Sequence, residues 1–268
     1  MAEVTSAAEH WEWTVCYHQP GKFKGRGEFL RLMLEDSQTP YNDSGADLYG
    51  PTGMMDAFRG SAEAVDEPST FPSPVFFPPA IWHRPADGEE VLINQVGACM
   101  IYLGDKIGYA PASVAERARA TSIMLNALDY MSEGWSSFRP LKNTMPYKDQ
   151  KEEGDKVSKE FSKQRMPLFL HHFNKFVIKN GSPTKPIAGG AGLTFADFCL
   201  FHVLDAAATQ FNSEHYDKAW DNETVPGLKE YYEWMKSRPN LQAYFKSNRC
   251  ARKYGACRPE RSHAIGLI

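Results

Sequence analysis

Leu193-Thr-Phe-Ala-Asp-Phe198 carries the strongest local signal in this 268-residue chain. Thr194 is typical of a helix N-cap, because its hydroxyl can accept a hydrogen bond from an amide of the first turn. Asp197 lies three residues further on, where its carboxylate can reach back to the Thr194 amide in a short-armed version of the capping box. Residues 195–209 are apolar on nearly every side, which predicts a helix buried at the centre of a helical domain.

Helical patterns also flank this segment. Residues 113–138 and 151–178 are long amphipathic stretches, and two shorter helices are expected at 227–238 and 240–249, separated at Pro239. Everything after residue 110 therefore predicts an all-helical domain.

The first 110 residues alternate between two patterns. Residues 13–17, Trp-Thr-Val-Cys-Tyr, predict a strand that ends at a turn. Helical spacing follows at 25–36, and then an irregular stretch in which only residues 52–59 suggest a weak helix. Further predicted elements are a hairpin formed by 80–83 and 91–93 and a helix at 95–107. The order strand, helix, irregular, hairpin, helix describes a small α/β unit.

Composition and charge agree with two domains. A hydrophobic share of 42% is that of a globular chain, and no apolar run approaches the roughly 18 residues of a membrane helix. Residues 1–110 hold 7 Lys and Arg against 16 Asp and Glu, a net charge of −9, whereas residues 111–268 hold 23 against 17, a net charge of +6. The charge changes sign where the sequence pattern changes.

Several classes of function are disfavoured. The start of the chain lacks the basic and apolar regions of a signal peptide, so we expect a cytoplasmic protein with no membrane span. Five cysteines without a CxxC pair indicate neither a disulfide framework nor a zinc site, and we expect no metal. GxGxxG, GxxxxGK[ST], GxSxG and HExxH motifs are absent. The basic residues between 246 and 261 resemble a solvated tail, so no nucleic acid partner is expected.

Five segments, in order, resemble the glutathione transferases of the tyrosine type, notably the sigma and mu classes. They are Tyr17 with Lys24-Gly-Arg-Gly-Glu-Phe-Leu-Arg31, Pro79-Ala-Ile-Trp82 with Asp87-Gly88, Gln95-Val-Gly-Ala-Cys-Met-Ile-Tyr-Leu103, Leu193-Thr-Phe-Ala-Asp-Phe198, and Val225-Pro-Gly-Leu228 with Ser237-Arg-Pro-Asn-Leu241. The resemblance spans residues 13–248. It implies a thioredoxin-like α/β domain at about 1–110, an all-α domain at about 111–268, and a homodimer.

The resemblance implies an enzyme that conjugates glutathione, as co-substrate, to small hydrophobic electrophiles. A free thiol has a pKa near ~8.5, and a hydroxyl that donates to the sulfur lowers it; Tyr17 is the residue expected to do this. The glutathione-binding residues implied are Tyr17, Arg26, Pro79, Ala80, Gln95 and Val96. Tyr130 and Trp135 are expected to wall the acceptor-substrate pocket. We expect the cluster Lys22, Lys24 and Arg26 to help an acidic domain hold an anionic tripeptide.

Some alternatives remain open from sequence alone. Val96 replaces the usual Ser or Thr of the family and leaves only a backbone amide for the ligand carboxylate. Either Pro78 or Pro79 can be the cis-proline, and Arg26 can pair with Glu28 instead of the thiolate.

Three rival functions also remain. Cys16 suggests a cysteine-type glutathione oxidoreductase, although neighbouring strand residues face opposite sides and only one can meet the ligand. The other rivals are a sigma-like isomerase or peroxidase and a non-catalytic binding or assembly module.

Overall fold

The computed structural model describes residues 11–17, 24–44, 73, 75–211, 214–221 and 224–250. Its sheet has four strands in the order β2-β1-β3-β4. The strands are β1 (Trp13–Cys16), β2 (Asn42–Ser44), β3 (Ala80–His83) and β4 (Val91–Asn94). β2 runs parallel to β1, whereas β3 is antiparallel to both β1 and β4.

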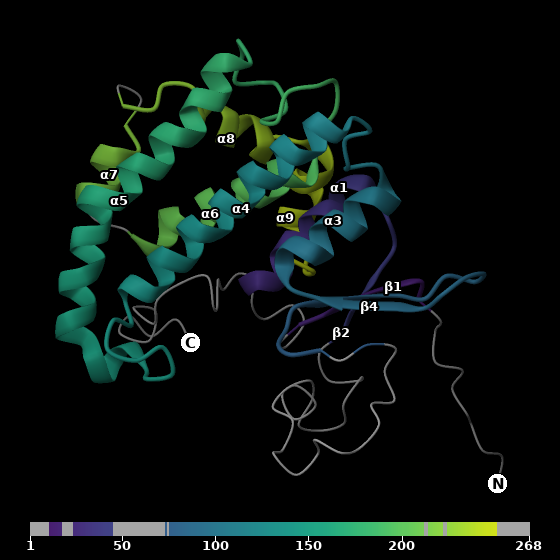
Figure 1. Ribbon diagram of the computed structural model, residues 1–268, viewed down its shortest axis with the longest axis horizontal. Helices are drawn as coiled ribbons and strands as arrows, with labels where there is room; N and C mark the ends of the chain where they lie inside the picture. Colours follow the sequence, from purple (N-terminus) through teal and green to yellow (C-terminus); the bar gives the residue numbers. More distant parts are fainter. Residues whose placement is uncertain are drawn as a thin grey trace, which may run out of the picture.

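Alternation along the strands separates two faces of the sheet. Val15, Tyr17 and Ile81 point into the main core, whereas Cys16 and Ala80 join a small cluster on the opposite face. Helices α1 (Glu28–Ser37) and α3 (Val96–Ile107) lie side by side and cover the first of these faces (Figure 1). The α/β unit expected from the sequence is therefore present.

The remainder of the described chain is helical. The segments are α4 (Val114–Ser137), η2 (Tyr147–Gln150), α5 (Lys151–Lys179), α6 (Phe195–Gln210), α7 (Glu214–Ala219), α8 (Leu228–Lys236) and α9 (Pro239–Lys246). Helix α6 packs against α4 and α8, and also against α1 and α3, so it lies at the centre of the molecule. The predicted thioredoxin-like unit followed by helices is confirmed.

The capping box that opens α6 is also confirmed. The Thr194 hydroxyl accepts a hydrogen bond from the Ala196 amide, and the Asp197 carboxylate accepts one from the Thr194 amide at 2.7 Å. Asp197 accepts further hydrogen bonds from the Ile187 amide and the Tyr231 hydroxyl. These bonds fix the start of the central helix, and therefore the position of every side chain along it.

One element differs from expectation. β2 is a short polar strand, Asn-Asp-Ser, with no hydrophobic alternation to reveal it. The two expected helices on either side of Pro239 are present as α8 and α9, and Pro239 itself begins α9, where an N–H would have no partner within the helix. The weak helix expected at 52–59 lies outside the described residues.

Helix α1 has almost no solvent face. Nine of its ten residues are buried, because one side packs on α3 and the other on α6 and α9. Its charged side chains meet partners near the end of the described chain. These contacts are Tyr244 Oη to Glu28 at 3.0 Å, Arg249 to Glu35 at 2.7 Å, and Arg238 to Asp36 at 2.7 Å.

None of the helices in the described ranges is both long and apolar enough to span a membrane.

Candidate functional site

Three strand ends meet at one edge of the sheet. In the observed register Cys16 lies opposite Ala80, and Ala80 lies opposite Asn94. The residues just beyond these positions, Tyr17, Pro79 and Gln95, therefore leave the sheet at the same edge. Tyr17 precedes Pro79 by more than sixty positions in the sequence, and the antiparallel pairing of β3 with both neighbours brings the three residues together.

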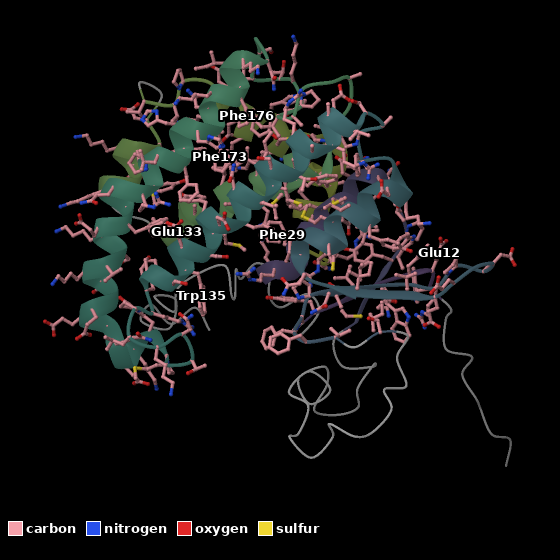
Figure 2. The ribbon with its side chains drawn as sticks, in the orientation of Figure 1. Glu12, Phe29, Glu133, Trp135, Phe173 and Phe176 are labelled. Carbon is pink, nitrogen blue, oxygen red and sulfur yellow. The ribbon has the colours of Figure 1, made fainter. Side chains whose placement is uncertain are left out.

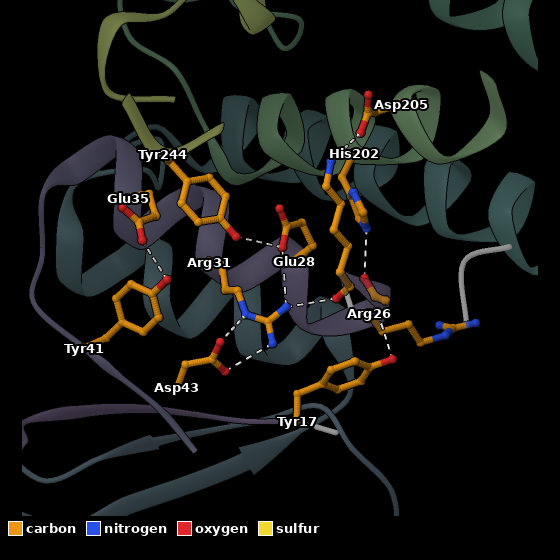
Figure 3. Close-up of polar contacts among 12 residues, drawn as sticks. Tyr17, Arg26, Glu28, Arg31, Glu35, Tyr41, Asp43, His202, Asp205 and Tyr244 are labelled. Atoms are coloured by element: carbon orange, nitrogen blue, oxygen red, sulfur yellow. Dashed lines mark hydrogen bonds and ion pairs between the residues drawn. The ribbon is translucent and has the colours of Figure 1, made fainter. Parts of the chain in front are cut away.

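The Tyr17 phenol is held by backbone. Its oxygen accepts a hydrogen bond from the Arg26 amide at 3.0 Å (Figure 3). The side chain is only 2% exposed, and the Arg31 guanidinium lies 5.7 Å from the ring centroid. The phenol is thus a buried group with a fixed direction rather than a mobile surface aromatic.

Two glycines make room for this ring. They belong to the short 3-10 helix η1 (Gly25–Gly27) that leads into α1. A Cβ atom on Gly25 would lie 2.3 Å from the Tyr17 hydroxyl oxygen, and one on Gly27 would lie 2.8 Å from the ring. Gly25 also has a φ of +49°, a value that favours glycine. A larger residue at either glycine of this Gly-Arg-Gly sequence would therefore collide with the Tyr17 ring.

The cis peptide bond joins Pro78 to Pro79, so Pro79 is the cis-proline of the two candidates. Both prolines are buried. Neither has an N–H, and Pro78 can therefore offer an extended ligand a carbonyl acceptor but no donor.

The start of α3 forms the third side of the edge. Gln95 precedes it with φ +72° and ψ +117°, a strained conformation for a residue other than glycine. The first amides of a helix have no partner within the helix and attract anions. Val96 occupies the first position with a buried side chain, so this helix start offers backbone amides without a side-chain hydroxyl.

The two described cations of the expected cluster have different partners. The Arg26 guanidinium lies 3.5 Å from the Ser132 hydroxyl of α4. The Lys24 amine lies 3.1 Å from Asp205 of α6. Glu28, the alternative partner suggested for Arg26, is instead bonded by Arg31 and Tyr244. Lys22 lies outside the described residues.

Tyr130 and Trp135 of α4 have separate environments. Tyr130 is 1% exposed and packs among Phe161, Phe169 and Phe173. The expectation that it walls an open pocket is corrected: its ring belongs to the core between α4 and α5.

Trp135 remains partly exposed, near the C-terminal end of α4 (Figure 2). It lies three residues after Ser132, and therefore on the helix face that contacts Arg26. The Arg139 guanidinium lies over its ring, with its central carbon 4.5 Å from the ring centroid.

Cys16 does not have the features of a reactive thiol. It is buried on the sheet face opposite to Tyr17, and burial raises the pKa of its thiol far above the ordinary value. A thiol held neutral in this way is a poor nucleophile. This environment argues against the cysteine-type chemistry considered from sequence.

Two residues near Tyr17 were not foreseen. Ser132 and His202 both come from the helical part of the chain, and His202 reaches the Gly25 carbonyl at 2.9 Å. A histidine within the largely apolar 195–209 segment was a detectable signal, because a buried polar side chain needs a hydrogen-bond partner. Among the described residues, no group of three or more His, Cys, Asp or Glu is arranged to hold a metal ion.

Comparisons with known proteins agree with this architecture. The glutathione S-transferase C-terminal domain model matches residues 137–248. A curated relative, glutathione S-transferase 1 of Ascaris suum, is 29% identical over 163 residues, covering 59% of this chain and 68% of that protein. These two findings support the glutathione S-transferase superfamily.

Solved structures show the same fold. The Onchocerca volvulus Pi-class glutathione S-transferase matches with a TM-score of 0.61 and 20% identity, covering 96% of each chain. The Fasciola hepatica sigma class enzyme matches with a TM-score of 0.60 and 18% identity, covering 88% of this chain and 96% of that one. The fold is therefore that of a glutathione transferase. Because a Pi-class and a sigma-class structure match equally well, the fold does not distinguish the class.

Proposed function

We propose that the protein is a tyrosine-type glutathione transferase, which conjugates the glutathione thiolate to small hydrophobic electrophiles. The observation that carries this proposal is the phenol of Tyr17, fixed by the Arg26 amide at the sheet edge where Pro79 and the start of α3 also lie. A hydroxyl aimed at that edge can donate to a sulfur and stabilise its anion.

Glutathione is an extended anionic peptide, and the edge offers it complementary groups. Its cysteinyl backbone would lie along the segment before Ala80, and its γ-glutamyl carboxylate would meet the first amides of α3 at Gln95 and Val96. Arg26 would add positive charge beside the thiolate, and Trp135 would face the acceptor. In this proposal residues 1–110 bind glutathione and residues 111–268 supply the acceptor side.

The test is a thiolate titration. Glutathione added to the full chain should show the ultraviolet absorbance of a thiolate with an apparent pKa about two below that of the free thiol. S-methylglutathione, which has no ionisable thiol, is the matched control. Turnover with a generic aryl halide should follow the same ionisation as the pH is varied. Binding of glutathione without any change in its thiol pKa would contradict the proposal that the protein is a glutathione transferase.

A non-catalytic binding module is the second candidate. Pro78 lacks an N–H donor, Val96 lacks a hydroxyl, and Tyr17 is nearly fully buried. Each of these features weakens one of the contacts that glutathione would make. The sigma-like isomerase or peroxidase needs the same activated thiol and differs only in its second substrate. Failure of the chain to bind immobilised glutathione would favour the module over both enzymes.

We also propose a homodimer formed through α4 and α5. Leu125 and Leu168 are 50% and 59% exposed on these helices. A hollow of about 210 Å³ lies on the same two helices. Its lining residues are Asn126, Arg165, Leu168, Phe169 and His172. An apolar surface of this kind is stabilised when a second copy covers it.

Sedimentation of the full chain should therefore give a mass of twice 30.2 kDa. Leu168→Asp should give the monomer mass, because the contact would have to bury a charged carboxylate in place of an apolar side chain. Leu141→Asp is the matched control, since this exposed leucine lies beyond the end of α4. A mass of 30.2 kDa for the unmodified chain would rule out the dimer.

A further inference from the structure

His202 is a buried histidine of α6 that reaches across to the sheet-bearing part of the chain. Its Nε2 atom lies 2.9 Å from the Gly25 carbonyl oxygen (Figure 3), and its ring makes an edge-on contact with Phe29. A carbonyl oxygen can only accept, so Nε2 carries the hydrogen and donates. Burial lowers the pKa of His202 to about 4, and the ring is therefore neutral at physiological pH.

The carbonyl that His202 contacts and the amide that holds Tyr17 belong to one peptide group. The Gly25 carbonyl and the Arg26 N–H are the two ends of a single planar unit. His202 donates to one end, and the other end donates to the Tyr17 oxygen at 3.0 Å. Hydrogen bonds in such a chain polarise one another, so a donor at the carbonyl strengthens donation by the amide.

A second contact from the same helix holds the adjacent residue. Asp205 lies one turn after His202 and pairs with the Lys24 amine at 3.1 Å. Asp205 also accepts a hydrogen bond from the Tyr232 hydroxyl at 2.8 Å. Helix α6 therefore contacts two successive residues, the Lys24 side chain through Asp205 and the Gly25 backbone carbonyl through His202.

We propose, on the basis of the function proposed above, that His202 is a positioning residue for the transferase reaction. It fixes and polarises the Gly25–Arg26 peptide, which in turn directs the Tyr17 phenol. A phenol that receives a stronger hydrogen bond is a stronger donor to the glutathione sulfur. The helical part of the chain thus adjusts the acidity of a thiol bound at the sheet edge.

His202→Leu removes the donor and keeps an apolar side chain of similar size. We expect the pKa of bound glutathione to rise by about 0.5, which lowers kcat/KM at pH 5.5 roughly threefold. The loss should disappear above the thiol pKa, where all of the glutathione is ionised. His202→Gln keeps an N–H donor and should therefore retain at least part of the lowered thiol pKa and of kcat/KM.

A double-mutant cycle separates positioning from general damage. In a Tyr17→Phe background, His202→Leu should leave the thiol pKa unchanged, because the phenol oxygen through which it acts is gone. Tyr231→Phe is the matched control. It removes another buried hydrogen bond of α6, from Tyr231 to Asp197 at 2.8 Å, and should lower stability without moving the thiol pKa.

The two proposals fail in different ways. If Tyr17→Phe raises the thiol pKa and His202→Leu does not, His202 has only a structural role and the inference is wrong. If neither variant changes it, the proposed function itself fails. Should the leucine variant not fold, His202→Met, which also lacks a donor, gives the same readout.

Discussion

Tyr17→Phe should raise the pKa of bound glutathione by about two, and lower kcat/KM about 100-fold well below the thiol pKa and about 25-fold at pH 7. Each pKa unit corresponds to about 1.4 kcal/mol of differential stabilisation, so the expected loss is about 2.7 kcal/mol. The phenylalanine ring fills the same space beneath Gly25 and Gly27. The change should therefore remove one hydroxyl and leave the packing intact.

The pH dependence of this loss distinguishes it from a binding defect. The loss of kcat/KM should be constant at pH values well below the thiol pKa of glutathione bound to wild type and to the variant. It should shrink as the pH rises through these two pKa values, because the substrate then ionises without help. Tyr102→Phe is the matched control: its hydroxyl bonds His83 at 2.8 Å at the other end of β3. Equal rates for wild type and Tyr17→Phe across this range would remove Tyr17 from the mechanism.

Arg31→Leu should destabilise the protein by about 3–5 kcal/mol, a large part of the free energy of unfolding of an ordinary domain. Arg31 is only 1% exposed. It donates to Asp43 at 2.8 Å, to the Lys24 carbonyl at 2.9 Å and to Glu28 at 3.4 Å (Figure 3). Leucine would leave the buried Glu28 carboxylate without its cation.

Denaturant unfolding measures this loss, and Arg117→Leu is the control. Arg117 pairs with Asp105 at 2.6 Å, but its side chain is 38% exposed. Exposed pairs contribute little because water screens them. Equal losses for the two variants would contradict the importance of burial.

The pH dependence gives the same prediction a second test. Burial raises the pKa of Glu28 above its ordinary value, and Arg31 opposes this rise. Removing Arg31 should raise the pKa further. A carboxyl with a raised pKa in the folded state favours folding when protonated, and this stabilisation is lost as the pH rises through the folded value. The free energy of unfolding that Arg31→Leu loses should therefore be smallest in acid and grow towards neutral pH.

The sequence predicted those elements that local chemistry specifies. The capping box at Thr194 and the hairpin of β3 and β4 were readable because caps and strand alternation depend on neighbouring residues. β2 was missed because Asn42-Asp-Ser44 has no apolar alternation, and its pairing with β1 depends on residues far away in the chain.

The site was foreseen in part for the same reason. Tyr17 and Pro79 stand next to predicted strands, so their placement followed from the strands. Lys24 was expected to face a ligand, yet its partner Asp205 lies 181 positions away, and no local pattern reports such a pair. Tyr130 shows the opposite error: an aromatic on an amphipathic helix can face the core or a pocket, and its spacing does not decide between them.

The burial of α1 limits how the protein can be divided. A fragment ending near residue 110 would keep the sheet, Tyr17 and the start of α3, which suggests a minimal glutathione binder. It would also expose the side of α1 that packs on α6 and α9, and leave Glu28, Glu35 and Asp36 without their partners. Cutting near residue 110, where the net charge changes sign, would thus produce an aggregation-prone, incompletely folded fragment. Any smaller version would need a redesigned α1 surface.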